Sequence, residues 1–169
     1  MIQQKLEWKK LIVLGLIAGG CQVTAGIVMY LSGIYFIRGS FFISLAVLLA
    51  CVVAESRWYR NTILAGEIKF TTSLLIGVFI SLSTGLLYAI YNLISVSFFY
   101  PHFLEDMVRA QISQVQSSGM DEVRAKAMIE MIKTNAVIST IALRNLLSLS
   151  IWGTGMSLIT SLILKRKKS

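Results

Sequence analysis

Four long apolar segments, separated by short polar stretches, define the pattern of this chain. No Lys, Arg, Asp or Glu interrupts them, and they cover Leu11–Ile37, Gly39–Ala54, Phe70–Tyr100 and Asn145–Leu164. A helix needs about 20 apolar residues to cross a hydrocarbon core about 30 Å thick. Three segments reach that length alone, and the second reaches it when it is extended through Trp58. We therefore predict four transmembrane helices, at about 11–37, 39–58, 70–100 and 145–164.

The segment between the third and fourth spans, residues 102–143, has a different pattern. Over its first part, 102–116, apolar residues recur mostly at intervals of three and four. This spacing is typical of an amphipathic helix. Ser117-Ser118-Gly119 interrupts that helix, and Asp121 is a suitable N-cap for a second one.

The second helix of this segment has no internal stop signal. Because no Pro or Gly occurs between Met120 and Gly153, we expect one long helix from about Glu122 into the fourth span. The predicted fold is all-α: a single domain, 1–169, formed by an integral membrane four-helix bundle. An extracytoplasmic amphipathic helical hairpin is expected between the third and fourth spans.

Small residues recur at helical spacings in every predicted span. Such residues let the backbones of membrane helices approach closely. We interpret them as the contacts of a tightly packed bundle, and a dimerisation face on the first span is the alternative. The repeats are Gly15 and Gly19; Ala46, Ala50 and Ala54; Ser73, Gly77, Ser81 and Gly85; and Gly153, Ser157 and Ser161.

Composition supports a lipid rather than an aqueous environment. Hydrophobic residues make up 56% of the chain and charged residues 14%, with a mean hydropathy of +0.73. An average soluble domain has about 25% charged residues. The net charge of +8 does not indicate nucleic acid, because most of the basic residues flank the apolar segments. The expected partner of these residues is the lipid bilayer.

The positions of the basic residues also predict the orientation of the chain. Basic residues near the ends of spans favour the cytoplasmic side. We therefore expect both termini in the cytoplasm, in a multi-pass protein of the cell inner membrane. An even number of spans is consistent with this, because it requires both termini on one side of the membrane. The basic residues on this face are Lys5, Lys9, Lys10, Arg57, Arg60, Lys69, Lys165, Arg166, Lys167 and Lys168.

Several short motifs occur in a fixed order along most of the chain. They are Gly66-Glu67-Ile68-Lys69-Phe70, Tyr100-Pro101-His102-Phe103-Leu104-Glu105, Gly119-Met120-Asp121-Glu122, and Gly153 with Ser157-Leu158-Ile159. In this order they resemble the bacterial membrane family called domain of unknown function 4199. The chain departs from the expected pattern at Tyr100, where an Asn or Asp would precede the proline. The resemblance implies a small inner-membrane protein and supplies no established activity.

Polar residues within or beside the spans are the candidate functional positions, because such groups are costly in lipid. Gln22, Glu55, Asn92, Arg144 and Asn145 form this predicted intramembrane or interfacial set. Arg144 lies at the outer boundary if the fourth span begins at 145. It lies inside the bilayer if the span begins near 134.

Motifs for catalysis and cofactor binding are absent from the sequence. The chain has one His, and no zinc-ligand cluster or phosphate-binding glycine loop. His102 with Met107, Met128 and Met131 has the ligand types of a copper site, but methionine also fills amphipathic interfaces. We predict no catalytic, cofactor-binding or metal residues.

Two functions fit these observations. The first is a non-enzymatic accessory or assembly subunit of a membrane complex, with the outer hairpin as the surface for a membrane-protein partner. The alternative is a small oligomeric transporter or channel.

Overall fold

A computed structural model describes residues 6–37 and 39–164 of the chain. Its elements, in order, are α1 (Trp8–Leu31), a short 3-10 helix η1 (Ile34–Phe36), α2 (Ser40–Thr62), α3 (Phe70–Phe98), α4 (Phe103–Gln116), α5 (Glu122–Asn135) and α6 (Ile138–Leu164). The all-α fold class is confirmed. Four of the helices, α1, α2, α3 and α6, are long and apolar enough to cross a membrane.

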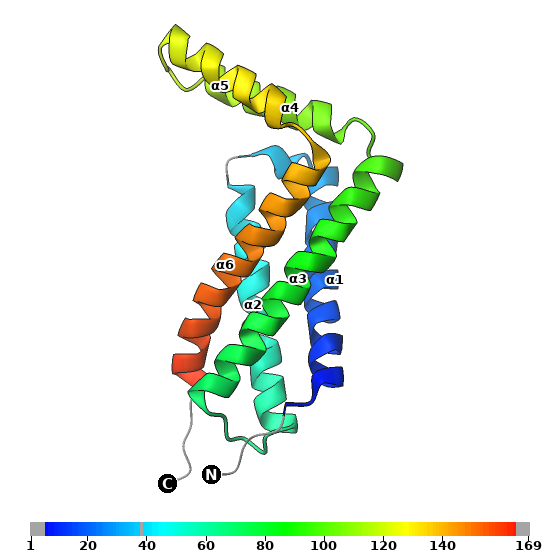
Figure 1. The fold of residues 1–169 in the computed structure, drawn as a ribbon, viewed down its shortest axis with the longest axis vertical. Helices are drawn as coiled ribbons and strands as arrows, with labels where there is room; N and C mark the ends of the chain where they lie inside the picture. The colour runs from blue at the N-terminus through cyan, green and yellow to red at the C-terminus, as the bar shows by residue number, and fades with distance from the viewer. Residues whose placement is uncertain (1–5, 38, 165–169) are drawn as a thin grey trace.

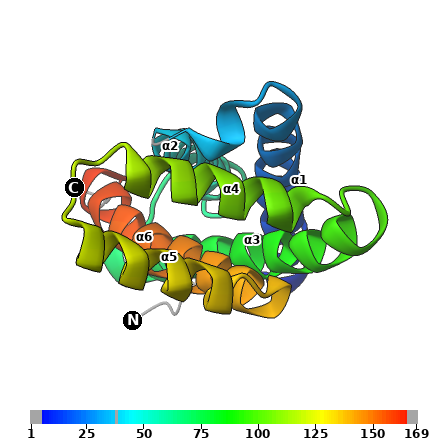
Figure 2. The ribbon, with the colours of Figure 1, turned by 90° about the horizontal axis from the view of Figure 1, so that it is seen from above.

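These four helices run side by side and form what we call the four-helix body (Figure 1). The start of α1 and the end of α6 lie at the same end of it. Helices α4 and α5 lie across the other end, next to each other and joined by a turn at Gly119 (Figures 1 and 2). The chain therefore has a body of four candidate membrane-spanning helices and a separate helical layer at one end.

The spans differ in their bounds from the sequence prediction. Helix α1 ends at Leu31, not near residue 37, because Gly33 adopts a left-handed backbone conformation with φ of 69° and η1 follows. Helix α2 continues past the predicted end at 58 to Thr62, and α3 ends at Phe98. Helix α6 begins at Ile138, well before the predicted start at 145.

The prediction of one continuous helix from Glu122 into the fourth span is wrong. The backbone leaves the helical conformation at Ala136, where ψ is 57°, and the amide of Val137 bonds to the carbonyl of Asn135. Helix α5 packs against α4 across the end of the body, whereas α6 runs along α3. A single straight helix could not make both contacts, so tertiary packing outweighs the uninterrupted helical sequence.

Small residues make the closest contacts within the four-helix body. An added Cβ at Gly77 would overlap Ser157 of α6, and one at Gly153 would overlap Ser81 of α3. We call this contact the α3–α6 seam. A Cβ at Gly15 would likewise meet Ser83 of α3. Helix packing within one chain therefore accounts for these small residues.

Helix α4 is amphipathic, as predicted from its sequence. Phe103, Met107 and Val115 are buried on one face. Phe103 packs against the aromatic rings of Tyr35 and Phe36, with ring centroids 5.3 and 5.8 Å away. Burial of this face holds α4 over η1 and the end of the four-helix body.

The predicted N-cap of α5 is confirmed. The Asp121 carboxylate accepts hydrogen bonds from the backbone amides of Val123 and Arg124, at 3.0 and 3.1 Å. These bonds satisfy amides that have no partner inside the helix. Helix α5 nevertheless buries none of its residues.

Candidate functional site

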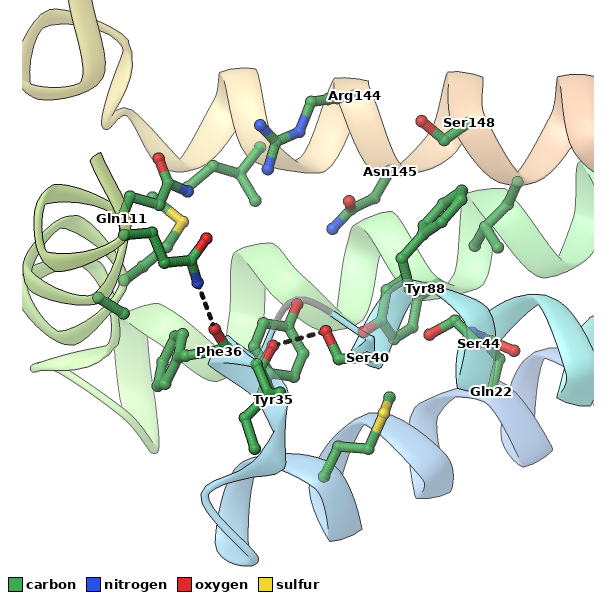
Figure 3. A pocket seen from close by; sticks show the side chains of 18 residues that line it. Gln22, Tyr35, Phe36, Ser40, Ser44, Tyr88, Gln111, Arg144, Asn145 and Ser148 are labelled. Atoms are coloured by element: carbon green, nitrogen blue, oxygen red, sulfur yellow. Dashed lines mark hydrogen bonds between the residues drawn. The ribbon is translucent and has the colours of Figure 1, made fainter. Parts of the chain in front are cut away.

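A cavity of about 380 Å³ lies where the four-helix body meets α4. Its walls come from all four long helices, and η1 and α4 cover it (Figure 3). The lining is rich in polar side chains, among them Gln22, Ser40, Ser44, Gln111 and Ser148. Ligand-binding pockets have volumes of about 300–1,000 Å³, so this space is large enough for a small ligand.

Local hydrogen bonds position the cover of the cavity. The left-handed Gly33 turns the chain back after α1, which places η1 above the ends of the helices. The Ser40 hydroxyl then donates to the carbonyl of Tyr35 at 2.8 Å. The Gln114 amide of α4 donates to the carbonyl of Phe36, also at 2.8 Å. Helices α2 and α4 thus hold η1 from both sides.

Tyr35 lies at the centre of the polar contacts. Burial raises the pKa of its hydroxyl above the ordinary value. Hydrogen bonding with Tyr88 opposes this shift in pKa, as do the positive charge of Arg144 and hydrogen bonding with Asn145. Tyr88, Arg144 and Asn145 line the same cavity as Tyr35 (Figure 3).

Arg144 is the one charged residue among the described residues that line the cavity. It lies on α6 and is exposed to the outside of the body as well as to the cavity. It makes no ion pair within residues 6–37 and 39–164. Helix α6 has 27 residues and is therefore about 40 Å long. If Leu164 marks one boundary of the hydrocarbon core, about 20 residues of helix place Arg144 at the other boundary.

Gln22 lies at the opposite side of the cavity from Arg144 (Figure 3). Its side chain is 0% exposed, and neither its amide nitrogen nor its amide oxygen has a hydrogen-bond partner among the residues that the structure describes. An unpartnered buried polar group destabilises a fold by about 1–3 kcal/mol. The Gln22 amide is therefore available to a molecule that enters the cavity.

The five residues predicted as one polar set are only partly brought together. Gln22, Arg144 and Asn145 line the cavity. Asn92 does not line it: this residue is buried, and its amide donates to the carbonyl of Tyr88 in its own helix at 2.8 Å. Every helix presents a backbone carbonyl at this position, four residues earlier in the chain. The burial of the polar Asn92 side chain is therefore explained without a functional role.

Glu55 is the member of the predicted set that lies elsewhere. It is buried near the other end of α2, beside a groove formed with Lys9, Lys10 and Trp58. Its carboxylate oxygens have no hydrogen-bond partner and make no ion pair in the part of the chain that is described.

Several cavity residues were missed by sequence reasoning. Gln111 and Gln114 line the cavity from α4. Their signal was present, because residues 107, 111 and 114 are four and three apart and so share a helical face with the buried Met107. Tyr35 and Ser40 had no such signal, since the apolar pattern placed them inside or beside predicted spans.

Within residues 6–37 and 39–164, no group of three or more His, Cys, Asp or Glu side chains is placed to hold a metal ion. His102 instead lies 3.5 Å from the carboxylate of Glu105. Met107 is buried on one face of α4, whereas Met128 and Met131 are exposed on α5. The four residues considered for copper therefore do not share one environment.

Comparison with known proteins identifies a family but no characterised relative. A family model described as "Protein of unknown function (DUF4199)" matches residues 14–166. No curated protein and no solved structure matches the chain.

Proposed function

Because the chain belongs to the DUF4199 family, whose description names no activity, we propose its function from its structure. We propose that it is a non-enzymatic, multi-pass membrane protein that acts as an accessory or assembly subunit of a membrane complex. Its partner-facing surface is α5.

The observation that supports this role is the exposure of apolar side chains on α5. Val123 is 78% exposed and Met131 is 62% exposed, and α5 buries no residue. Apolar side chains that are gathered at a surface commonly mark a site of protein or membrane interaction. Helix α4 shows the contrast, because its apolar residues are already buried against η1 and the body.

The orientation that accompanies this proposal places α5 outside the cell membrane and both termini in the cytoplasm. Two observations support it: the basic residues beside the spans, and the position of the start of α1 and the end of α6 at one end of the four-helix body (Figure 1). A reporter fused after Ser169 should be active only in the cytoplasm. A reporter inserted at Gly119 should be active only on the outer side, and the reverse pattern would refute the orientation.

Site-specific photo-crosslinking in native membranes tests the role of α5. A photoreactive residue at position 123 should give a discrete crosslink to one membrane protein, which purifies with the tagged chain. The same group at Ile12, which is exposed on α1, serves as the control for lipid contact. Exclusively lipid adducts at position 123 would contradict a partner-facing role.

Paired substitutions separate the apolar residues of α5 from its charges. Val123→Ser with Met131→Ser should reduce recovery of the partner about tenfold, because truncated apolar anchors can each weaken an interface by more than 1 kcal/mol. Glu130→Gln lies on the same helix and is also exposed, so it should leave recovery unchanged. Equal recovery of the partner with the wild-type protein, the double serine variant and Glu130→Gln would exclude α5 as the interface.

The second candidate function is a small oligomeric transporter or channel, and the polar cavity is the observation that favours it. In that case Arg144 and Gln22 lie on the pathway. Substituting Arg144 should abolish transport in proteoliposomes and leave partner recovery unchanged. Substitutions on α5 should have the opposite effect.

A further inference from the structure

Among the described residues, those that line the cavity under α4 combine one positive charge with several hydrogen-bond donors and no carboxylate. Arg144 is the only charged side chain among the described residues that line it. Asn145, Tyr35 and Tyr88 lie beside it and contribute amide and hydroxyl groups. A guanidinium group presents a planar fork of donors that matches carboxylate and phosphate oxygens.

The deep side of the cavity supplies an independent observation. Gln22 is 0% exposed and lines the cavity, and its amide makes no hydrogen bond within residues 6–37 and 39–164. Buried side-chain polar groups in proteins are hydrogen-bonded in the large majority of cases. Since no described residue offers Gln22 a partner, its partner should be a polar group of a molecule that occupies the cavity.

Three residues that line the cavity are also exposed at the surface of the protein: Ile37, Phe41 and Arg144. Arg144 lies at a boundary of the hydrocarbon core if α6 spans it as described above, which is the depth at which lipid headgroups begin. The two apolar residues offer a surface that suits hydrocarbon chains. The opening thus has the polarity of an entrance for a headgroup.

We infer that this cavity binds the anionic, oxygen-rich group of a small ligand, with Arg144 bound to a phosphate or carboxylate and Gln22 bound to a neighbouring hydroxyl or carbonyl. A phosphoglycerol group has this chemistry, and it occurs both as a lipid headgroup and as a soluble compound. The inference does not depend on α5 or on a protein partner.

Binding to the purified, delipidated full-length protein tests this inference. Native mass spectrometry in detergent would be used to titrate three probes: phosphatidylglycerol, diacylglycerol and glycerol phosphate. The first carries both headgroup and chains, the second only the chains, and the third only the headgroup. Phosphatidylglycerol should bind at least about tenfold more tightly than diacylglycerol, because only the former offers charge-assisted hydrogen bonds.

The third probe identifies the source of the ligand. Binding of phosphatidylglycerol without measurable binding of glycerol phosphate would support a lipid ligand. Comparable binding of glycerol phosphate would support a soluble anion with the same chemistry. Equal affinity for phosphatidylglycerol and diacylglycerol would overturn the inference.

Matched variants locate the binding in the cavity. Arg144→Gln should weaken binding of phosphatidylglycerol by about tenfold or more. Arg124→Gln removes the same charge from the exposed surface of α5 and should leave binding unchanged. Equal losses in the two variants would indicate general attraction between a basic protein and an anionic lipid, and would refute the site.

A second variant keeps the inference testable if Arg144→Gln does not fold. Ser148 also lines the cavity and is partly exposed. Ser148→Phe fills the space and retains the charge of Arg144, so it should also abolish binding. Unchanged binding in a folded Ser148→Phe protein would overturn the proposal.

Discussion

The α3–α6 seam and the cavity under α4 both contain polar residues inside the four-helix body, but they differ in how those residues are bonded. In the seam, Ser81 donates to the carbonyl of Gly77 at 2.8 Å, and Ser157 donates to the carbonyl of Gly153 at 2.6 Å. Each serine is thus satisfied by its own helix, four residues earlier. Gly77 and Gly153 provide the space that the serine of the facing helix occupies.

Two polar residues of the cavity lack this internal compensation. Among the described residues, Gln22 has no hydrogen-bond partner and Arg144 has no ion pair. A polar residue within an apolar span is therefore not by itself a sign of function. The more informative property is whether the helix satisfies that residue locally, as it does for Ser81 and Ser157 in the seam and does not do for Gln22 in the cavity.

The largest expected effect comes from filling the seam. Gly153→Leu would force a side chain into Ser81 and toward Leu48, and neither helix can move away without losing its other contacts. We expect the free energy of unfolding to fall by about 3 kcal/mol, at the upper end of typical overpacking effects. Circular dichroism during thermal or denaturant unfolding in detergent would measure the change.

Gly155 is the matched control for this substitution. It follows Thr154, the neighbour of Gly153, on the same helix. An added Cβ at Gly155 would meet no atom within 4 Å. Gly155→Leu should change the free energy of unfolding by no more than about 1 kcal/mol, the difference in helix propensity between the two residues. Similar losses at both positions would show that the seam is not a steric contact.

Two glutamines of the cavity should give effects of opposite sign. Gln22→Met removes the unpartnered amide and nearly preserves the volume, so the ligand-free protein should gain about 1 kcal/mol of stability. Gln114→Met breaks the bond to the carbonyl of Phe36 and should lose about 1 kcal/mol. Unfolding curves of the delipidated proteins would measure both changes in the free energy of unfolding. A loss of stability in Gln22→Met would mean that its amide is already satisfied.

Hydrophobic patterning predicted those parts of the fold that depend on one helix at a time. The four spans, the amphipathic α4 and the Asp121 cap each follow from residues that are close in sequence. The turn at η1 did not, because Ile34–Phe36 is as apolar as the span before it. Hydropathy cannot separate a helix from a turn when both are apolar, and Gly33 was the only local sign.

The candidate site was harder to predict because it is assembled from several helices. The sequence placed Gln22, Glu55 and Asn92 in one polar set, since each is a polar residue in an apolar span. Their grouping depends on how each helix is rotated and where it ends. Only packing decides that Gln22 faces Arg144 and Asn145 across the cavity, that Asn92 bonds within α3, and that Glu55 lies near the other end.

Removing the N-cap of α5 tests whether this helix can unfold separately from the four-helix body. Asp121→Ala removes two hydrogen bonds at the start of the helix and should destabilise α5 by about 1 kcal/mol. Hydrogen exchange at the amides of Val123 and Arg124 should accelerate, while exchange in the α3–α6 seam stays unchanged. Asp121→Asn keeps a capping oxygen and should retain most of the protection. Accelerated exchange throughout the protein would show that α5 and the body unfold together.

The smallest expected effect concerns the response of the cavity to alkaline pH. Burial raises the pKa of Tyr35 above its ordinary value of 10.0, so the folded protein holds this proton more tightly than the unfolded chain does. The resulting stabilisation is fully present below pH 10.0 and is lost as the pH rises through the folded-state pKa, because unfolding then releases a proton. Tyr35→Phe removes this contribution, so its stability should decline less steeply above pH 10.0 than that of the wild-type protein. Unfolding curves at a series of alkaline pH values would measure the difference, and parallel declines would show that the Tyr35 hydroxyl is not held in a buried, protonated state.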